Sequence, residues 1–399
     1  MCDVIGAAVN AIPEPNRRGV LKALAVGAGS VAAGAVATGP AVASGPASTG
    51  PATSGRGHRT RLVTIGTLGG PTYMVPGSTG ICTAVVYGDR HYLVDLGMGS
   101  YKTFIDSKLW PQTGANDTLS GLAGILFTHL HSDHTTDWAG IYATGSMNAA
   151  NRATGAVPGP IKVFGPGNRG SLPAVFPPHR PAPPVVNPAD PTPGISAMTG
   201  YLRQAFAQDF NDRLRDSSFP DPKDLFDVHD IDLTGIWDPA SPAGVPPRIS
   251  PFPVWQDGDV SITATLVDHH AMSPSFGFRF DTPDGSIVIS GDTTVSANLI
   301  ELAQGADILV HEVIDPVFVE RLVANIPDPV TQAAVRNHLL GAHTTIEQVG
   351  RDVAEPAGVK TLVLSHLVPA DNPTGRWMEA KQGYSGRVVV GRPLMEMGL

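Results

Sequence analysis

The chain has 399 residues, 42% of them hydrophobic and 16% charged, so it can bury a substantial core and is expected to be globular rather than disordered. Its two cysteines, Cys2 and Cys82, lie in no Cys-rich metal spacing and exclude a disulfide framework. The net charge of −9 argues against nucleic acid as the main substrate, because binding of a phosphate backbone needs a basic surface.

Residues 1–43 have the pattern of an export signal. The pair Arg17-Arg18 precedes an uncharged stretch, Ala23 to Ala43, that is rich in Ala, Gly and Val, and this arrangement resembles a twin-arginine (Tat) signal. Residues 44–60 have the composition of a flexible linker. An uncleaved membrane anchor is the alternative interpretation, although the stretch is only weakly hydrophobic. We expect a periplasmic or secreted protein with no stable membrane association after cleavage.

Short β-like runs follow at residues 61–65, 82–87, 91–95 and 124–128, separated by turn signals. The last run leads directly into His129, His131, Asp133 and His134, four potential metal ligands on one short loop. Such ligands suit zinc, and a site with an open position lowers the pKa of bound water to about 7, which supplies a hydroxide nucleophile. This loop therefore predicts half of a hydrolytic metal site.

The middle of the chain, residues 153–259, holds 20 of the 37 prolines and is predicted to be a loop-rich insertion. One helix is expected within it, at residues 200–215. Residues 152–259 carry nine Lys or Arg against twelve Asp or Glu, so this segment is not expected to clamp RNA. Four aromatic residues could line a pocket or simply belong to the core: Phe176, Phe206, Phe210 and Trp237.

Residues 260–399 return to alternating strands and helices, with strands expected at 261–267, 276–280, 286–290, 307–310 and 360–365 and helices at 296–304 and 345–354. Three of these strands are followed by ligand-type residues: His269 and His270, Asp292, and His366. A rigid sheet fixes the loops at its strand ends, which is where catalytic groups collect. These residues are expected to complete the site.

Together with Asp95 in Val94-Asp95-Leu96-Gly97, these motifs make the chain resemble a metallo-β-lactamase-fold hydrolase over roughly residues 61–366, apart from the proline-rich insertion. The resemblance implies an α/β fold, a four-layer αββα sandwich with a two-metal site at one edge. It assigns His129, His131 and His269 to the first zinc, Asp133, His134 and His366 to the second, and Asp292 to the bridge between them. Asp95 would support the ligand loop. Manganese or iron would also suit these ligands.

The choice between His269 and His270 depends on the same resemblance. In the resembling families the third histidine is followed by a turn and an aromatic-Gly-aromatic strand, which here is Phe276-Gly277-Phe278. This spacing favours His269 as the ligand and leaves His270 as a neighbouring or substrate-facing group.

Two further motifs resemble a branch that contains tRNase Z-type phosphodiesterases and zinc arylsulfatases: His311-Glu312 and His343-Thr344. The resemblance implies that His343 is the general acid and that Glu312 supports it, and a carboxylate partner raises the pKa of an imidazole. His311 could instead satisfy backbone groups at a strand end. Residues 162–167 and 209–216 resemble segments of the arylsulfatase-like group more loosely.

We expect an exported dinuclear zinc hydrolase that cleaves a sulfate ester or phosphodiester of a small molecule, with Asp133, His343 and Glu312 as catalytic residues. A lactonase or carboxyl-ester hydrolase on the same metals is one alternative, and a metal-binding protein without turnover is another. The expected partner is a small-molecule ester and not nucleic acid. Residues 367–399 could cap a sheet edge or join a homodimer.

Overall fold

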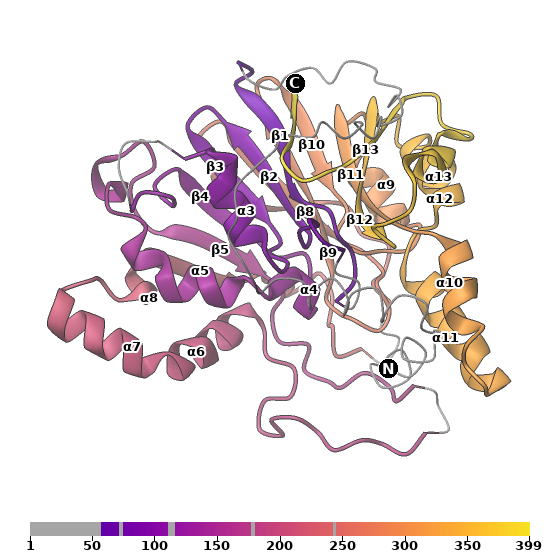
Figure 1. Cartoon of the computed structure of the whole chain (residues 1–399), viewed down its shortest axis with the longest axis horizontal. Helices are drawn as coiled ribbons and strands as arrows, with labels where there is room; N and C mark the ends of the chain where they lie inside the picture. The colour runs from indigo at the N-terminus through magenta and orange to yellow at the C-terminus, as the bar shows by residue number, and fades with distance from the viewer. Residues whose placement is uncertain (1–56, 72–74, 111–115, 177–179, 242–244) are drawn as a thin grey trace, which may run out of the picture.

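The computed structural model describes residues 57–71, 75–110, 116–176, 180–241 and 245–399. Two seven-stranded sheets form its centre, and helices lie against their outer faces (Figure 1). The predicted export signal and residues 44–56 of the predicted linker lie outside the described residues. Among the residues described, no helix is long and apolar enough to cross a membrane.

The first sheet has the strand order β14-β1-β2-β3-β4-β5-β6. Its strands are β1 (Thr60–Gly66), β2 (Cys82–Tyr87), β3 (Arg90–Val94), β4 (Leu122–Leu126), β5 (Ile161–Gly165), β6 (Phe226–Asp230) and β14 (Met395–Gly398). Pairing is antiparallel from β14 to β3 and parallel from β3 to β6. The loops that follow β3, β4, β5 and β6 therefore emerge at one edge of the sheet.

The second sheet repeats this half-antiparallel, half-parallel plan in the order β13-β12-β11-β10-β9-β8-β7. Its strands are β7 (Phe252–Asp257), β8 (Val260–Leu266), β9 (Phe276–Thr282), β10 (Gly285–Ile289), β11 (Ile308–Ile314), β12 (Thr361–Val368) and β13 (Arg387–Val390). Both sheets are thus mixed, and the parallel half of each provides ligand-bearing loops.

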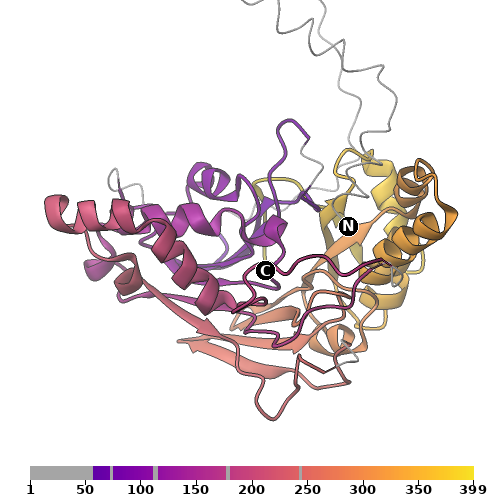
Figure 2. The same cartoon turned by 90° about the horizontal axis from the view of Figure 1, so that it is seen from below.

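Helices of the two halves of the chain lie on opposite sides of the molecule (Figure 2). The first half contains α3 (Ser100–Ser107), α4 (Ser132–Thr135), α5 (Trp138–Thr144), α6 (Ile195–Ala205), α7 (Ala207–Asp212) and α8 (Pro222–Leu225). The second half contains α9 (Ala297–Leu302), α10 (Pro316–Val323), α11 (Pro329–Ala342), α12 (Ile346–Gln348) and α13 (Thr374–Trp377). Short 3₁₀ and π segments are η1 (Gly145–Met147), η2 (Arg152–Thr154), η3 (Arg213–Ser217), η4 (Val349–Ala354) and η5 (Met378–Lys381).

Alternation along the strands divides the core into layers. In β1, Leu62 packs between the two sheets, whereas its neighbour Val63 packs on the outer face among residues of α3 and α5. In β11, Val310 lies between the sheets and Leu309 packs under the helices of the second half. Because successive strand residues face opposite sides, both faces of each sheet are apolar, as a sheet buried on both faces requires.

The proline-rich middle contributes more to the sheets than the sequence predicted. Residues 153–259 were expected to form an insertion, but they include β5 and β6 of the first sheet and β7 of the second. The prolines are absent from β5 and β6, and β7 accommodates Pro253 because it is an edge strand. The predicted helix 200–215 starts earlier, in α6, and is interrupted at Phe206 before α7. Within the described part of residues 153–259, the loops between these strands and helices lie outside the core.

Residues 367–399 close both sheets. β13 pairs with β12 at the edge of the second sheet, and β14 pairs with β1 at the edge of the first. Of the two roles considered for this segment, the structure shows the capping of sheet edges.

Candidate metal centre

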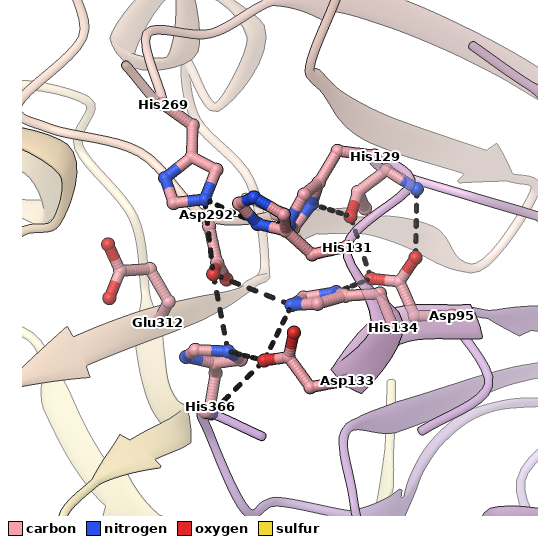
Figure 3. A network of polar contacts seen from close by, with 12 residues as sticks. Asp95, His129, His131, Asp133, His134, His269, Asp292, Glu312 and His366 are labelled. Atoms are coloured by element: carbon pink, nitrogen blue, oxygen red, sulfur yellow. Dashed lines mark hydrogen bonds and ion pairs between the residues drawn. The ribbon is translucent and has the colours of Figure 1, made fainter. Parts of the chain in front are cut away.

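All seven predicted metal ligands lie close together at the edge of the sheets (Figure 3). His129, His131, Asp133 and His134 come from the loop after β4 and from α4, and the second sheet provides the other three, His269 after β8, Asp292 after β10 and His366 within β12. Residues up to 237 positions apart in the chain therefore meet at one point. His269 belongs to this cluster, whereas His270 is exposed.

Three imidazole nitrogens converge in the first half of the cluster. The His131 Nδ1 atom lies 3.0 Å from His129 Nε2 and 3.2 Å from His269 Nε2. His269 Nδ1 lies 2.9 Å from the Ala342 carbonyl oxygen and must donate to it, so its Nε2 carries a lone pair. His129 Nδ1 is 3.1 Å from a Thr128 hydroxyl that already donates to Asp95, which gives His129 the same tautomer.

These tautomers leave more lone pairs than protons at the point of convergence. The single nitrogen of His131 can donate to only one of its two neighbours. A cation between the three nitrogens would satisfy all of them. Two nitrogens bound tetrahedrally to one zinc at its usual bond length lie about 3.3 Å apart, close to the observed separations. The residues present therefore fit a zinc ion.

The second half of the cluster mixes imidazoles and carboxylates. Asp133 Oδ2 lies 3.4 Å from His366 Nε2 and 3.7 Å from His134 Nε2. Asp292 Oδ2 is 3.2 Å from His366 Nε2, 3.4 Å from His134 Nε2 and 3.8 Å from His269 Nε2. One carboxylate oxygen of Asp292 thus contacts imidazoles of both halves, which is the position required of a bridging ligand.

Burial and charge give His129, His269 and Asp292 the protonation states that metal binding requires. Burial lowers the pKa of His129 and of His269, so both imidazoles are neutral. Burial opposes ionisation of Asp292, but His366 and His134 outweigh it and hold the pKa of that carboxyl well below its usual value. Neutral imidazoles and ionised carboxylates are the forms that bind divalent cations.

Asp95 holds the loop that carries His129 to His134 in place through hydrogen bonds. It follows β3 with a φ of 61°, and its carboxylate accepts hydrogen bonds from the Thr128 backbone N–H and hydroxyl, both at 2.8 Å. The same carboxylate accepts a bond of 2.9 Å from His134 Nδ1. This contact fixes the tautomer of His134 and points its Nε2, which has no hydrogen-bond partner among the described protein atoms, toward the two acidic ligands.

Replacing Asp95 with asparagine is expected to lower the free energy of unfolding by about 2–3 kcal/mol and to weaken metal binding about tenfold or more. The reason is that three groups donate to the Asp95 carboxylate, and the NH₂ group of asparagine would face at least one of these donors without being able to accept its hydrogen bond. Asparagine tolerates the left-handed backbone conformation at this position, so the change tests the carboxylate itself. Chemical denaturation and competition with a zinc chelator measure the two effects. The exposed Asp89→Asn variant is the control, and equal stability of the two variants would contradict the assigned role.

His343 and Glu312 lie next to the metal centre. His343 follows α11, and its Nδ1 is 3.3 Å from Glu312 Oε1 and 3.9 Å from Asp292 Oδ2. Burial opposes protonation of His343, but the nearby Glu312 carboxylate raises the pKa of the imidazole to about 9. Glu312 Oε1 also accepts the backbone N–H groups of Thr293 and Thr344, at 3.2 and 2.9 Å. A fixed carboxylate thus holds a proton-bearing imidazole at the edge of the site.

The remaining residues considered from the sequence lie outside this centre. His311 is fully buried, and its Nδ1 lies 2.7 Å from the Glu312 carbonyl oxygen, so it satisfies a backbone group. Phe210 is buried in the outer core, and Phe206 and Trp237 pack against core clusters. Phe176 contacts the His338 ring, with the ring centres 5.5 Å apart.

Two backbone groups at the centre were not foreseen from the sequence. The Gly70 N–H donates to Asp133 Oδ2 at 3.1 Å, and the carbonyl of Ala342 at the end of α11 orients His269. A Cβ atom at Gly69 would come within 2.5 Å of His366 Nδ1, so only glycine fits beside this ligand. The turn signal Gly69-Gly70-Pro71 was recognisable, but its proximity to the metal loop depends on the tertiary fold.

No family model matches the chain. It is 29% identical to ribonuclease Z of Mycobacterium bovis BCG Pasteur over 327 residues, which cover 80% of this chain and 91% of the relative. Ribonuclease Z of Mycobacterium avium is 29% identical over 322 residues, with the same coverage. Among solved structures, human short-form tRNase Z superimposes with a TM-score of 0.52 at 17% identity, over 84% of this chain and 98% of that one.

A second solved structure, the metallo-β-lactamase-fold protein YhfI from Bacillus subtilis, gives a TM-score of 0.51 at 16% identity, over 84% of this chain and 98% of that one. The predicted fold is thereby confirmed at the level of two mixed sheets enclosed by helices. The chain therefore has the metallo-β-lactamase fold, it is similar in sequence to mycobacterial proteins named ribonuclease Z, and its His/Asp cluster has the residue types and spacing of a metal site.

Proposed function

We propose that the chain is a dinuclear zinc enzyme that hydrolyses a phosphodiester or sulfate ester of a small molecule. The observation that supports this most is the position of His343, whose imidazole lies beside both Glu312 and the bridging candidate Asp292. An ester with a basic leaving oxygen needs a proton at that oxygen when its bond breaks. A buried, protonated imidazole next to the metal ligands is suited to supply it.

His129, His131 and His269 would hold one ion, Asp133, His134 and His366 the other, and Asp292 would bridge the two. When bound there, two such ions would supply positive charge that favours ionisation of a water molecule and offsets charge on the oxygens of the ester. In this scheme His343 donates a proton from its imidazole to the leaving oxygen, and Glu312 keeps the ring oriented and protonated. Asp133 is fixed by Gly70 and keeps His366 in place.

A phosphodiester is favoured over a sulfate ester because the curated relatives are named ribonuclease Z. A small substrate is favoured over RNA by charge, since the chain carries a net charge of −9. A hollow of about 660 Å³ also lies along the edge of the first sheet that bears the metal loop. It is lined by Asp230, Asp232 and Asp238 together with Trp237, and these carboxylates would repel a polyanion.

RNA is the second candidate substrate, and the similarity to proteins named ribonuclease Z and tRNase Z favours it. The two candidates differ in how activity should depend on salt. If RNA is held through phosphate contacts, its affinity and therefore its rate of cleavage fall steeply as the salt concentration rises. The rate of hydrolysis of a small ester changes little.

One substrate panel tests these alternatives on the purified protein lacking residues 1–43. It contains bis-p-nitrophenyl phosphate, p-nitrophenyl sulfate, a homoserine lactone and a tRNA precursor, each assayed at 50 and 200 mM salt with a chelator-treated control. We expect hydrolysis of the phosphodiester with little salt dependence. Cleavage of the tRNA precursor alone would replace the small-ester proposal with the RNA one, and activity on the lactone alone would indicate the carboxyl-ester alternative.

We also propose export of the protein, on the basis of the twin-arginine pattern in residues 1–43. The N-terminal sequence of protein recovered outside the cytoplasm would then begin near Ser44. Recovery of the uncleaved chain from the cytoplasm alone would contradict this part of the proposal.

A further inference from the structure

A small buried cavity of about 20 Å³ borders the metal centre on the side of the core. Its apolar walls include Val94, Ile289 and Val310, all members of the core between the two sheets. Two hydroxyl residues also line it, Thr83 from β2 of the first sheet and Ser365 from β12 of the second, and each is about 1% exposed. The cavity therefore lies between the sheets, immediately behind the ligands.

Four oxygen atoms of the residues around this cavity have no hydrogen-bond partner among the protein atoms that the structure describes. They are Thr83 Oγ1, Ser365 Oγ, Asp292 Oδ1 and Glu312 Oε2. The other oxygen of each carboxylate is engaged: Asp292 Oδ2 faces the imidazoles, and Glu312 Oε1 accepts two backbone N–H groups. The unpaired oxygens are thus two hydroxyl and two carboxylate atoms. Three imidazole nitrogens of lining residues also have no hydrogen-bond partner among the described protein atoms: His134 Nε2, His311 Nε2 and His366 Nδ1.

Leaving four such atoms unpaired in the interior would cost about 1–3 kcal/mol for each hydroxyl and more for each charged oxygen. Buried polar groups are rarely left in this state, and bound water commonly satisfies them. A volume of 20 Å³ exceeds the minimum of about 10–15 Å³ for one water molecule. Water also has the required valence, because it can donate to two carboxylate oxygens and accept from two hydroxyls.

We propose that this cavity holds one ordered water molecule that links Thr83 and Ser365 to the carboxylates of Asp292 and Glu312. The water would fix the second oxygen of each carboxylate, so that neither group can rotate away from the histidines it serves. Thr83 and Ser365 are then positioning residues: they act on the metal centre through Asp292 and on His343 through Glu312. The water also joins the two sheets at the edge where the ligands from both must meet.

The test compares three single variants of the full mature protein. In Thr83→Val and Ser365→Ala one hydroxyl partner of the water is lost. The control is Thr265→Val. Thr265 is as buried as Thr83 and Ser365, and its hydroxyl also has no hydrogen-bond partner among the described protein atoms, but Thr265 does not line the cavity. Zinc affinity is measured by chelator competition, and the midpoint of thermal unfolding is measured on metal-loaded and on chelator-treated protein.

We expect Thr83→Val and Ser365→Ala each to weaken zinc binding about tenfold and to lower the unfolding midpoint of the chelator-treated protein by about 2–4 °C, because the water loses a partner and the carboxylates lose support. Thr265→Val should leave zinc affinity unchanged and should not lower the midpoint. If the cavity is dry, all three changes remove an unpaired hydroxyl, and Thr83→Val and Ser365→Ala will match the control. That result would overturn the inference.

A crystal structure of the wild-type protein provides an independent check that does not depend on any variant folding. It should show one solvent peak within hydrogen-bond distance of all four oxygens, and a cavity without density would overturn the inference. The inference rests on the proposed metal centre only for its effect on zinc affinity. Stability of the chelator-treated protein and the solvent peak test the water site even if the proposed substrate class is wrong.

Discussion

Replacing His343 with asparagine is expected to lower kcat about 10²–10⁴-fold on esters whose leaving oxygen is strongly basic, because the proton donor is lost. The position of the imidazole, 3.3 Å from Glu312 and 3.9 Å from Asp292, is the basis of this expectation. On p-nitrophenyl esters, whose leaving group is stable as an anion, the loss should be much smaller. Steady-state kinetics on a p-nitrophenyl and an alkyl ester of the same acid measure the difference.

The metal content of the His343→Asn variant shows whether His343 acts as a general acid or as a metal ligand. His343 lies close enough to His269 and Asp292 to contact an ion itself, so the variant must be shown to retain both metals. His229→Asn is the matched control, since His229 lies in β6 of the first sheet and pairs with Asp227 at 2.8 Å rather than with Glu312 or Asp292. An equal loss on both leaving groups, or the loss of one metal ion from His343→Asn, would contradict the role of general acid.

Replacing Asp292 with asparagine is expected to reduce activity on the order of 10³-fold, equivalent to about 4 kcal/mol of transition-state stabilisation, and to lower the metal content by one ion per chain. A single oxygen of Asp292 contacts four imidazoles within 3.9 Å, those of His134, His269, His343 and His366. Asparagine keeps the shape of this side chain but removes the negative charge that the two proposed dications would require.

The surface variant Asp227→Asn is the control, because it removes an aspartate that pairs with Lys162 and His229 rather than with the metal site. Activity and metal content are measured together by kinetics and by mass spectrometry of the metals. If Asp292→Asn kept two ions and ordinary activity, Asp292 would not be the bridge, and the division of the ligands between two ions would be wrong.

Sequence alone predicted much of this arrangement because the chemistry is concentrated in short motifs. His129 to His134 is a local pattern, and the turn from β4 into α4 brings its four ligand-type side chains to one place. His269, Asp292 and His366 could be proposed because each comes soon after a recognisable apolar run, although the strand at His366 continues to Val368. The choice of His269 over His270 followed from the resemblance, in which the third ligand histidine stands at this spacing from the next strand, and the structure places His269 in the cluster.

What could not be predicted depends on contacts between distant segments. The Gly70 N–H at Asp133 and the Ala342 carbonyl at His269 are backbone groups, which no residue type reveals. β5, β6 and β7 were hidden by the prolines around them, since proline density indicates loops without locating the short proline-free runs between them. The pairing of Thr83 with Ser365 across the cavity arises only when the two sheets are packed together.

The metal content of the purified wild-type protein tests the central claim most directly. Elemental analysis should find two zinc ions per chain, or two ions that include manganese or iron, and removal by a chelator should abolish hydrolysis until metal is restored. The proposed division of the seven clustered ligand-type side chains between two ions predicts this stoichiometry. A content of one ion or fewer per chain, or hydrolysis that survives complete chelation, would contradict a dinuclear hydrolase.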